Sequence, residues 1–252
     1  MPNPRSGFSK NELRRYSRQL NLPGFGLEGQ KKLKSAKICV AGLGGLGSPA
    51  SLYLAAAGVG TLGIIDDDTV QVENLQRQIL YSTPEIGKSK TGRAAARLSA
   101  LNPGIKIIKH PVKITPDNAK KILRSYDLVL DCSDNFVCRR ILNDACIALK
   151  KPLISGSVYR FEGQVAVLHP GTGPCYRCLY PEMPPDEAAL SCEQAGILGV
   201  IPGIIGAMEA LEALKWLFSK KDSSGKLFIF DGLSMELSAV QIRKSRTCPA
   251  CK

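Results

Sequence analysis

Residues 37–41 form a short apolar run that is followed at once by Gly42-Leu43-Gly44-Gly45-Leu46-Gly47 and then by a segment rich in small residues. An apolar run, a glycine-rich turn and a helix-forming segment in this order are typical of the first β-α unit of a nucleotide-binding parallel sheet. Gly42 permits a tight turn, Gly44 lets the backbone approach a phosphate or ribose, and Gly47 allows a helix to pack closely on the strand. The feature predicts an α/β fold with a nucleotide site at the end of its first strand.

Strand-like and helix-like segments continue to alternate as far as residue 155, which favours a parallel sheet with helices on both faces. After Gly156 this alternation ends, and further strands and one long apolar helix are expected. The expected strands are residues 37–41, 61–65, 105–109, 126–131, 152–155, 164–168, 226–230 and 238–243, and the expected helices are residues 48–58, 88–101, 116–124, 135–150 and 203–218.

Four cysteines form two Cys-x-x-Cys pairs, Cys175/Cys178 and Cys248/Cys251, which lie far apart in the chain. Two such pairs supply the closed tetrahedral shell of a structural zinc ion, which would tie the C-terminus back onto the domain. A redox-active pair or two unrelated pairs are the alternatives. The expected fold is therefore α/β, with a Rossmann-like, mostly parallel sheet and flanking helices, extended by antiparallel strands and a zinc-clipped C-terminal part.

The chain is expected to divide into a helical N-terminal extension, residues 1–36, and one main domain, residues 37–252. Within the main domain, residues 37–156 are the nucleotide-binding half, and residues 157–252 are the half that holds the substrate and the metal. No internal repeat interrupts this plan.

The net charge of +12 lies mostly in residues 1–37 and 243–252. An acidic protein partner or nucleotide phosphates are the expected counterparts, because no nucleic-acid-reading motif or aromatic interleaving accompanies the basic residues. The alternative is a solvated basic surface that only keeps the protein soluble. The longest apolar stretch, residues 199–218, contains three charged residues and is expected to be a core helix with no role in a membrane. Nine cysteines without an export signal predict reduced thiols and a cytoplasmic protein.

Charged residues beyond the glycine loop distinguish between two kinds of nucleotide enzyme. Asp66 ends the second expected strand, where a carboxylate can accept hydrogen bonds from ribose hydroxyls, as in an NAD enzyme. Arg77 and Lys90 favour ATP, because a pyrophosphate leaving group needs its charge neutralised. Asp134 follows the fourth expected strand and offers an oxygen ligand for Mg²⁺. A solvated Arg77, an exposed Lys90 and a helix-capping Asp134 are the alternatives.

In the order of the chain, these motifs resemble those of the MoeB/ThiF/HesA family, the bacterial relatives of ubiquitin-activating enzymes. The resemblance covers nearly the whole chain. It is carried by Arg14-Arg15-Tyr16-Ser17-Arg18-Gln19, residues 42–47, Asp66-Asp67-Asp68, Asn74-Leu75-Gln76-Arg77-Gln78, Lys90, Asp131-Cys132-Ser133-Asp134-Asn135, Gly163-Gln164, Cys175-Tyr176-Arg177-Cys178, Cys192-Glu193-Gln194-Ala195-Gly196 and the final cysteine pair.

The resemblance implies a MgATP-dependent adenylyltransferase that activates the C-terminal glycine carboxylate of a ubiquitin-like sulfur carrier similar to MoaD or ThiS. It implies a homodimer in which Arg18 reaches the ATP site of the neighbouring subunit, and it makes residues 157–252 the carrier-binding half. Sulfur is expected to come from a separate donor, such as a cysteine desulfurase or rhodanese. The sequence does not choose between carriers for molybdenum cofactor, thiamine, thiolated tRNA or an amino acid.

The candidate residues follow from the motifs and the resemblance together. Adenosine contacts are implied for Gly45 and Asp66, phosphate contacts for Asn74, Arg77 and Lys90, and the Mg²⁺ contact for Asp134. The candidate nucleotide-binding residues are Gly42, Gly44, Gly45, Gly47, Asp66, Asp68, Asn74, Gln76, Arg77, Lys90, Asp134 and Asn135; the candidate catalytic residues are Arg18, Arg77, Lys90, Asp134 and Cys192; the zinc ligands are Cys175, Cys178, Cys248 and Cys251.

Two positions stay open at this stage. Cys192 either forms a covalent link to the carrier, as in ThiF-like members, or is dispensable, as in MoeB-like members. Glu73 stands where relatives often carry serine, and a carboxylate there would repel phosphates unless it faces solvent or Mg²⁺.

Three other functions remain as alternatives. Adenylation of a peptide C-terminus or of a carboxylate linked to tRNA would use the same nucleotide site. An NAD-dependent dehydrogenase would bind its cofactor without needing Arg77. A non-catalytic module would bind a carrier without turning over ATP.

Overall fold

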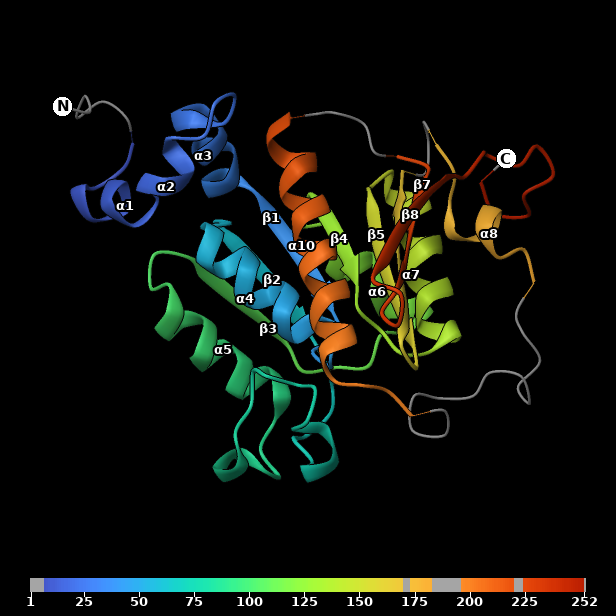
Figure 1. Ribbon diagram of the computed structural model, residues 1–252, viewed down its shortest axis with the longest axis horizontal. Coiled ribbons are helices and arrows are strands. Elements are labelled where there is room, and N and C mark those ends of the chain that lie inside the picture. Colours follow the sequence, from blue (N-terminus) through green and yellow to red (C-terminus); the bar gives the residue numbers. More distant parts are fainter. Residues whose placement is uncertain (1–6, 170–172, 183–195, 220–223, 252) are drawn as a thin grey trace.

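The computed structural model describes residues 7–169, 173–182, 196–219 and 224–251. In these residues the strands form one sheet in the order β3-β2-β1-β4-β5-β6-β7-β8 (Figure 1). All pairs from β3 to β5 are parallel, and all pairs from β5 to β8 are antiparallel. The strands are β1 (Lys37–Ala41), β2 (Thr61–Ile65), β3 (Lys106–His110), β4 (Leu128–Asp131), β5 (Leu153–Tyr159), β6 (Glu162–Leu168), β7 (Lys226–Asp231) and β8 (Glu236–Gln241).

Helices cover both faces of the sheet, as Figure 1 shows, with α4 and α10 in front and α6 and α7 behind. β1 explains the two layers, because its side chains alternate between two buried clusters: Ile38 and Val40 face α4 and α10, whereas Cys39 and Ala41 face α6 and α7. The helices are α1 (Lys10–Arg15), α2 (Ser17–Leu20), α3 (Gly26–Ser35), α4 (Gly47–Ala57), α5 (Lys90–Leu101), α6 (Pro116–Leu123), α7 (Phe136–Leu149), α8 (Tyr176–Leu179) and α10 (Val200–Ser219).

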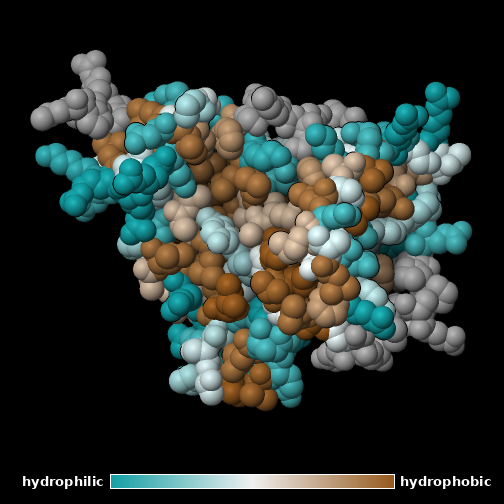
Figure 2. Space-filling model, in the orientation of Figure 1, coloured by the Kyte–Doolittle hydropathy of each residue, from teal (hydrophilic) through white to brown (hydrophobic). Residues whose placement is uncertain are grey.

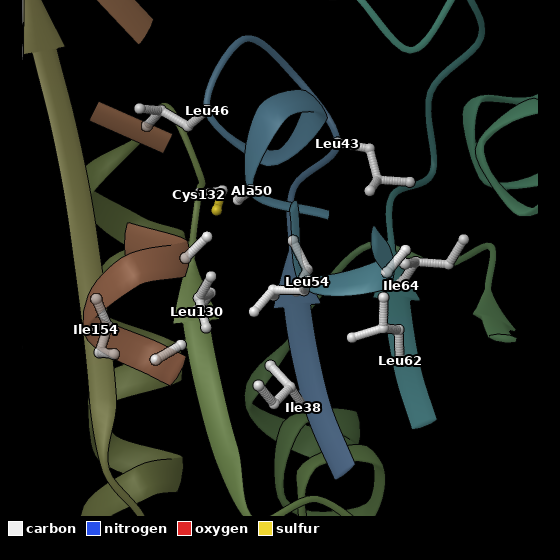
Figure 3. Close-up of a cluster of buried hydrophobic side chains, with 14 of the residues drawn as sticks. Ile38, Leu43, Leu46, Ala50, Leu54, Leu62, Ile64, Leu130, Cys132 and Ile154 are labelled. Carbon is white, nitrogen blue, oxygen red and sulfur yellow. The ribbon is translucent and has the colours of Figure 1, made fainter. Parts of the chain in front are cut away.

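The larger cluster lies between the sheet and α4, where Leu54 packs with Ile38, Leu62, Leu130 and Ile154 from four parallel strands (Figure 3). All five side chains are fully buried. Burying a leucine or isoleucine side chain contributes about 1.5–3 kcal/mol, so this layer supplies much of the driving force that holds the strand ends in place.

The N-terminal helices pack on α4 and α10 through α3. The ring of Phe25 meets that of Phe218 on α10 edge to face, with 5.1 Å between centroids. Gln30, which is fully buried, donates its side-chain amide to the Ala57 carbonyl at 2.9 Å. These contacts fix α3 against α4 and α10.

The expected fold class is confirmed, with small differences at the ends of elements. α5 begins at Lys90, two residues later than expected, because the side chain of Ser89 caps the helix by accepting from Gly92 N. The strand expected at residues 238–243 is β8, which begins at Glu236 because its pairing with β7 sets that register. In the described part of the chain, no helix combines the length and the apolar character that a membrane crossing requires.

Candidate active site

A cleft of about 420 Å³ opens at the carboxyl ends of the parallel strands. It lies between the loops that follow β1 and β4, which is the point where the strand order reverses. Ligands of open α/β sheets bind at such switch points, because the two loops diverge there. From the candidate list, the residues that line the cleft are Gly42, Gly44, Gly45, Asp66, Asp68, Arg77, Lys90, Asp134 and Asn135.

The glycine loop makes its turn where a side chain has no room. Gly42 has a φ of +91°, and a Cβ there would lie 2.7 Å from the Cys132 carbonyl oxygen. A Cβ on Gly47 would lie 1.9 Å from the Gly42 carbonyl oxygen, so Gly47 serves the packing of α4 and does not line the cleft. The loop leads directly into α4, whose N-terminal amides favour an anion.

Asp66 supports the glycine loop from the end of β2. Its Oδ2 accepts from Leu43 N at 2.8 Å, and its Oδ1 accepts from Asp68 N at 2.9 Å. Burial raises the pKa of Asp66, while the charge of Lys90 and the two N–H donors act in the opposite direction. The carboxylate is thus held at the cleft wall by the backbone on both sides.

Two cations line the same cleft. Lys90 is only 5% exposed, and its Nζ lies 3.0 Å from Asp68 Oδ2. Arg77 is half-buried, and its Nη1 donates to the Glu73 carbonyl at 2.9 Å, while Glu73 itself is exposed. A buried ammonium and a guanidinium facing one concave site suit a polyphosphate. The alternative interpretation of the sequence, in which Lys90 lies on an exposed face, is therefore wrong.

The loop after β4 presents Asp134 and Asn135. Asn135 caps α7 by accepting from Cys138 N at 2.8 Å. The alternative in which Asp134 caps this helix is therefore wrong. The Asn135 amide also donates to Asp134 Oδ1 at 3.2 Å. Asp131 anchors the loop from below, because its carboxylate is fully buried and accepts from Ser133 and Ser155. Asp134 stays exposed at the cleft, where its carboxylate can hold a divalent cation.

Several expected residues lie elsewhere. Asn74 and Gln76 do not line the cleft, although both belong to the segment that carries Arg77. Arg18 is exposed on α2 and does not line the cleft of its own chain. Cys192 lies outside the described residues.

Sequence reasoning missed three cleft residues and one buried acid behind them. Lys113 follows β3, at the same edge of the sheet as the predicted residues, so the position itself was a usable signal. Gln78 belongs to the Asn74–Gln78 motif and lines the cleft, although it is not among the candidate residues. Arg139 and Glu209 lie on helices, and nothing in their sequence neighbourhood shows that both are buried.

Glu209 on α10 is a fully buried carboxyl group behind the cleft. Its oxygens lie 3.5 and 3.6 Å from Cys132 Sγ, and a backbone N–H of Gly156 donates to it. Burial raises the pKa of Glu209 well above its usual value, the nearby Asp131 raises it further, and Cys132, Arg139 and Gly156 lower it in part. The folded protein therefore holds this proton more tightly than the unfolded chain does.

Replacing Glu209 with glutamine is expected to make stability less dependent on pH. The folded protein keeps a proton that the unfolded chain releases above about pH 4.5, so the contribution of Glu209 is fully present below that pH and is lost as the pH rises. The free energy of unfolding of the variant, relative to that of wild type, should therefore increase between pH 5 and 8 by at most about 1.4 kcal/mol per pH unit. Urea unfolding across that range measures it, and Glu236→Gln, at an exposed carboxylate, should change nothing. A constant offset between variant and wild type would contradict a raised pKa of Glu209.

The four cysteines expected to bind metal come together in one buried cluster. Cys175 Sγ lies 3.6 Å from Cys248 Sγ, and Cys178 Sγ lies 3.4 Å from Cys251 Sγ. All four sulfur atoms lie within 4.8 Å of one another. Four thiolates around one zinc ion at 2.3 Å would be about 3.8 Å apart, so the cluster has the size of a tetrahedral metal site. Backbone N–H groups of Ser245 and Ala250 approach two of these sulfurs, as in metal-thiolate sites.

A Rossmann-like sheet with a cation-lined cleft at its switch point and a cysteine cluster at its end defines a nucleotide-binding α/β enzyme. Residues 16–250 match the model of the ThiF family. The chain is 48% identical to a sulfur carrier protein adenylyltransferase of Thermus thermophilus, over 97% of this chain and 92% of the relative. It is 49% identical to the adenylyltransferase and sulfurtransferase MOCS3-1 of Drosophila pseudoobscura pseudoobscura, over the whole chain but only 56% of that protein.

Solved structures agree on the fold. The chain superposes on Escherichia coli MccB with ATP with a TM-score of 0.82, covering 100% of this chain and 77% of MccB at 22% identity. It superposes on PaaA with a TM-score of 0.79, covering 97% of this chain and 79% of PaaA, also at 22% identity. The chain belongs to the ThiF family, as its motifs predicted, and it is an adenylyltransferase. It spans about half the length of the MOCS3 relatives it matches.

Proposed function

We propose that this adenylyltransferase uses MgATP to activate the C-terminal glycine carboxylate of a ubiquitin-like sulfur carrier. The observation that carries the proposal is the cleft in which Arg77, Lys90 and Asp134 surround the glycine loop. The name of the Thermus relative, a sulfur carrier protein adenylyltransferase that matches over nearly the full length of both chains, supports the choice of substrate.

The chemistry explains why such a cleft is needed. A carboxylate is a stabilised anion and resists attack by a sulfur nucleophile. When the carrier carboxylate oxygen attacks the α-phosphorus of ATP, a carbonyl–O–P bond forms and the bond to the pyrophosphate oxygen breaks. The products are the acyl-adenylate, which carries AMP as a good leaving group, and pyrophosphate.

In this proposal the cleft residues divide the work. Gly45 and Asp66 hold the adenosine part, Asn74 lies close to the phosphates, and Asp134 holds Mg²⁺. Arg77 and Lys90 neutralise the charge that develops on the pyrophosphate, and fixed cations in a partly dry site do so with little reorganisation. Asn74 reaches this role only if its segment moves, because it does not line the cleft.

Other elements of the proposal involve partners. The exposure of Arg18 on α2 is compatible with a homodimer in which this guanidinium reaches the cleft of the neighbouring subunit. A separate sulfur donor, such as a cysteine desulfurase or rhodanese, would then act on the adenylate. Whether Cys192 takes part by a covalent link stays a prediction. The four clustered cysteines would hold a structural Zn²⁺, whose closed shell leaves no position for substrate.

We propose that the carrier docks near the β7–β8 hairpin, beyond the antiparallel end of the sheet. Figure 2 shows apolar side chains gathered on this face of the molecule, and the most exposed ones in the hairpin are Leu233 and Met235, at 75% and 72%. The neighbouring β5–β6 turn adds Tyr159 and Phe161, which are also exposed. Val158, just before this turn, lines the cleft, so a carrier seated here could extend its C-terminal tail toward the nucleotide.

Changing Leu233 and Met235 together to glutamate is expected to raise the KM for the carrier by ten- to a hundredfold, because two charges would face an apolar partner. The Kd for ATP should stay within about twofold of wild type, since neither residue lines the cleft. Steady-state kinetics with varied carrier, together with ATP titration calorimetry, measure both values. Glu236→Gln in the same hairpin is the matched control. An unchanged carrier KM would move the docking site elsewhere.

The function itself is tested by ATP–pyrophosphate exchange with purified protein, Mg²⁺ and candidate carriers. Each carrier is compared with a version that lacks its terminal glycines. Exchange only with an intact carrier is the expected result, and the carrier that supports the fastest exchange identifies the pathway. ATP binding without exchange by any carrier would refute adenylation of such a carrier.

A further inference from the structure

Arg139 on α7 is a buried cation that reaches the floor of the nucleotide cleft. It is only 7% exposed, yet it is among the residues that line the cleft. Its Nη2 donates to the Ser133 carbonyl at 2.7 Å, and the fully buried Asp131 supplies the opposite charge nearby. The guanidinium thus holds the backbone of the loop that presents Asp134, without itself belonging to the exposed part of the site.

Tyr176 also lies close to the guanidinium. Burial raises the pKa of Tyr176, and the nearby charge of Arg139 acts in the opposite direction; the tyrosine is only 3% exposed. Tyr176 directly follows the cluster residue Cys175 and begins α8. Its backbone N–H donates to the side chain of Asn143, a fully buried residue of α7, at 2.8 Å.

These contacts form a continuous connection between two distant features. The cysteine cluster fixes Cys175, the backbone carries that position to Tyr176, and Tyr176 lies beside Arg139. Arg139 in turn fixes Ser133. Arg177, one residue further on, adds a 2.6 Å ion pair with Asp144 of α7, so α8 is held on α7 at both Tyr176 and Arg177.

We propose that Arg139 is a positioning residue for the adenylylation reaction, and that Tyr176 holds it so that the cysteine cluster sets the geometry of the loop over residues 132–135. This inference rests on the proposed use of ATP at the cleft. It gives the cluster a role beyond stability, since loosening α8 would loosen the loop that presents Asp134 to the metal-bound nucleotide.

Tyr176→Phe tests the connection, because it removes only the hydroxyl. Tyr180→Phe is the matched control: its ring lies 5.1 Å from that of Tyr176, but its hydroxyl donates to Gln164 instead. Hydrogen exchange followed by mass spectrometry, without substrates, should show exchange of the peptide covering residues 132–138 accelerated about tenfold in Tyr176→Phe and unchanged in Tyr180→Phe, as loss of one polar contact with a charged group implies. Equal exchange in both variants would overturn the proposal.

Kinetics supply the second readout. Tyr176→Phe should raise the KM for ATP about tenfold while leaving the carrier KM within twofold, a split that general destabilisation would not produce. Arg139→Lys should retain more activity than Arg139→Gln, and Lys150→Gln, at the exposed end of the same helix, should match wild type. If Arg139→Lys and Arg139→Gln lose activity equally and the loop exchange is unchanged, the positioning role is refuted. Should wild type show no exchange reaction at all, the proposed function fails, and the hydrogen-exchange comparison still decides the connection.

Discussion

Replacing Lys90 with methionine is expected to lower the rate of ATP–pyrophosphate exchange by about 10³-fold. Lys90 is buried in the cleft, and within the described part of the chain its ammonium makes no hydrogen bond to a backbone carbonyl. Its ion-pair partner Asp68 is largely exposed. Methionine keeps most of the side-chain volume, so the change removes charge and little packing.

The size of the effect follows from where the charge lies. As pyrophosphate leaves, negative charge builds up on the oxygen that joined it to the α-phosphate. An ammonium in a partly dry site stabilises that charge far better than water does. Losing about 4 kcal/mol of transition-state stabilisation corresponds to the expected fall in rate. The thermal midpoint should change little, because the ion pair with exposed Asp68 contributes about 1 kcal/mol at most.

Lys88→Met is the matched control, since Lys88 is exposed two residues earlier and does not line the cleft. Its exchange rate should equal that of wild type. If Lys90→Met also retains wild-type exchange, the phosphates do not lie where this account places them.

Replacing Cys251 with serine is expected to abolish metal binding and to lower the unfolding midpoint by about 10 °C or more. Structural zinc in small domains contributes about 10–16 kcal/mol of binding free energy, and part of that should appear here as folding stability. For a chain of this size each kcal/mol shifts the midpoint by about 2–4 °C. Folding stability should depend on the metal because the metal closes the long loop between the two cysteine pairs. Residues 243–251 contribute no strand to the sheet that would hold them in place instead.

Metal analysis of the purified protein and differential scanning calorimetry measure the two effects. Wild type should carry about one zinc per chain, and Cys138→Ser should carry the same, because Cys138 lies outside the cluster. Retention of zinc by Cys251→Ser, or an unchanged midpoint after metal loss, would contradict a structural metal site. A disulfide between the pairs would show as zinc-free wild type that responds to reductant.

The parallel half of the fold could be predicted because its signals are local. The run over β1, the glycine loop and the small residues of α4 lie within one short segment, and each agrees with the next. The same logic placed Asp66 and Asp134 at strand ends, and the structure brings both to one cleft. The cysteine cluster was predictable as well, because the spacing of each pair limits what the sulfurs can reach.

The rest of the site depends on tertiary contacts that leave no local trace. Arg139 and Glu209 sit on helices where charged residues usually face solvent, and only the packing of α7 and α10 on the sheet buries them. Asn74 and Gln76 belong to a conspicuous motif, yet the turn of that segment directs Arg77 to the cleft and not them. In the antiparallel half, register comes from pairing with a neighbouring strand, so the start of β8 could not be read from its own residues.

The central claim is tested most directly by the intact mass of the carrier after incubation with the protein and MgATP. We expect that the full-length carrier gains one adenylyl group at its C-terminal glycine and that pyrophosphate is released in equal amount. The carrier without its terminal glycines should gain nothing, and neither should the full-length carrier with Lys90→Met protein over the same time. A carrier that keeps its mass while the protein binds ATP, or an adenylyl group found at any other position, would contradict the account.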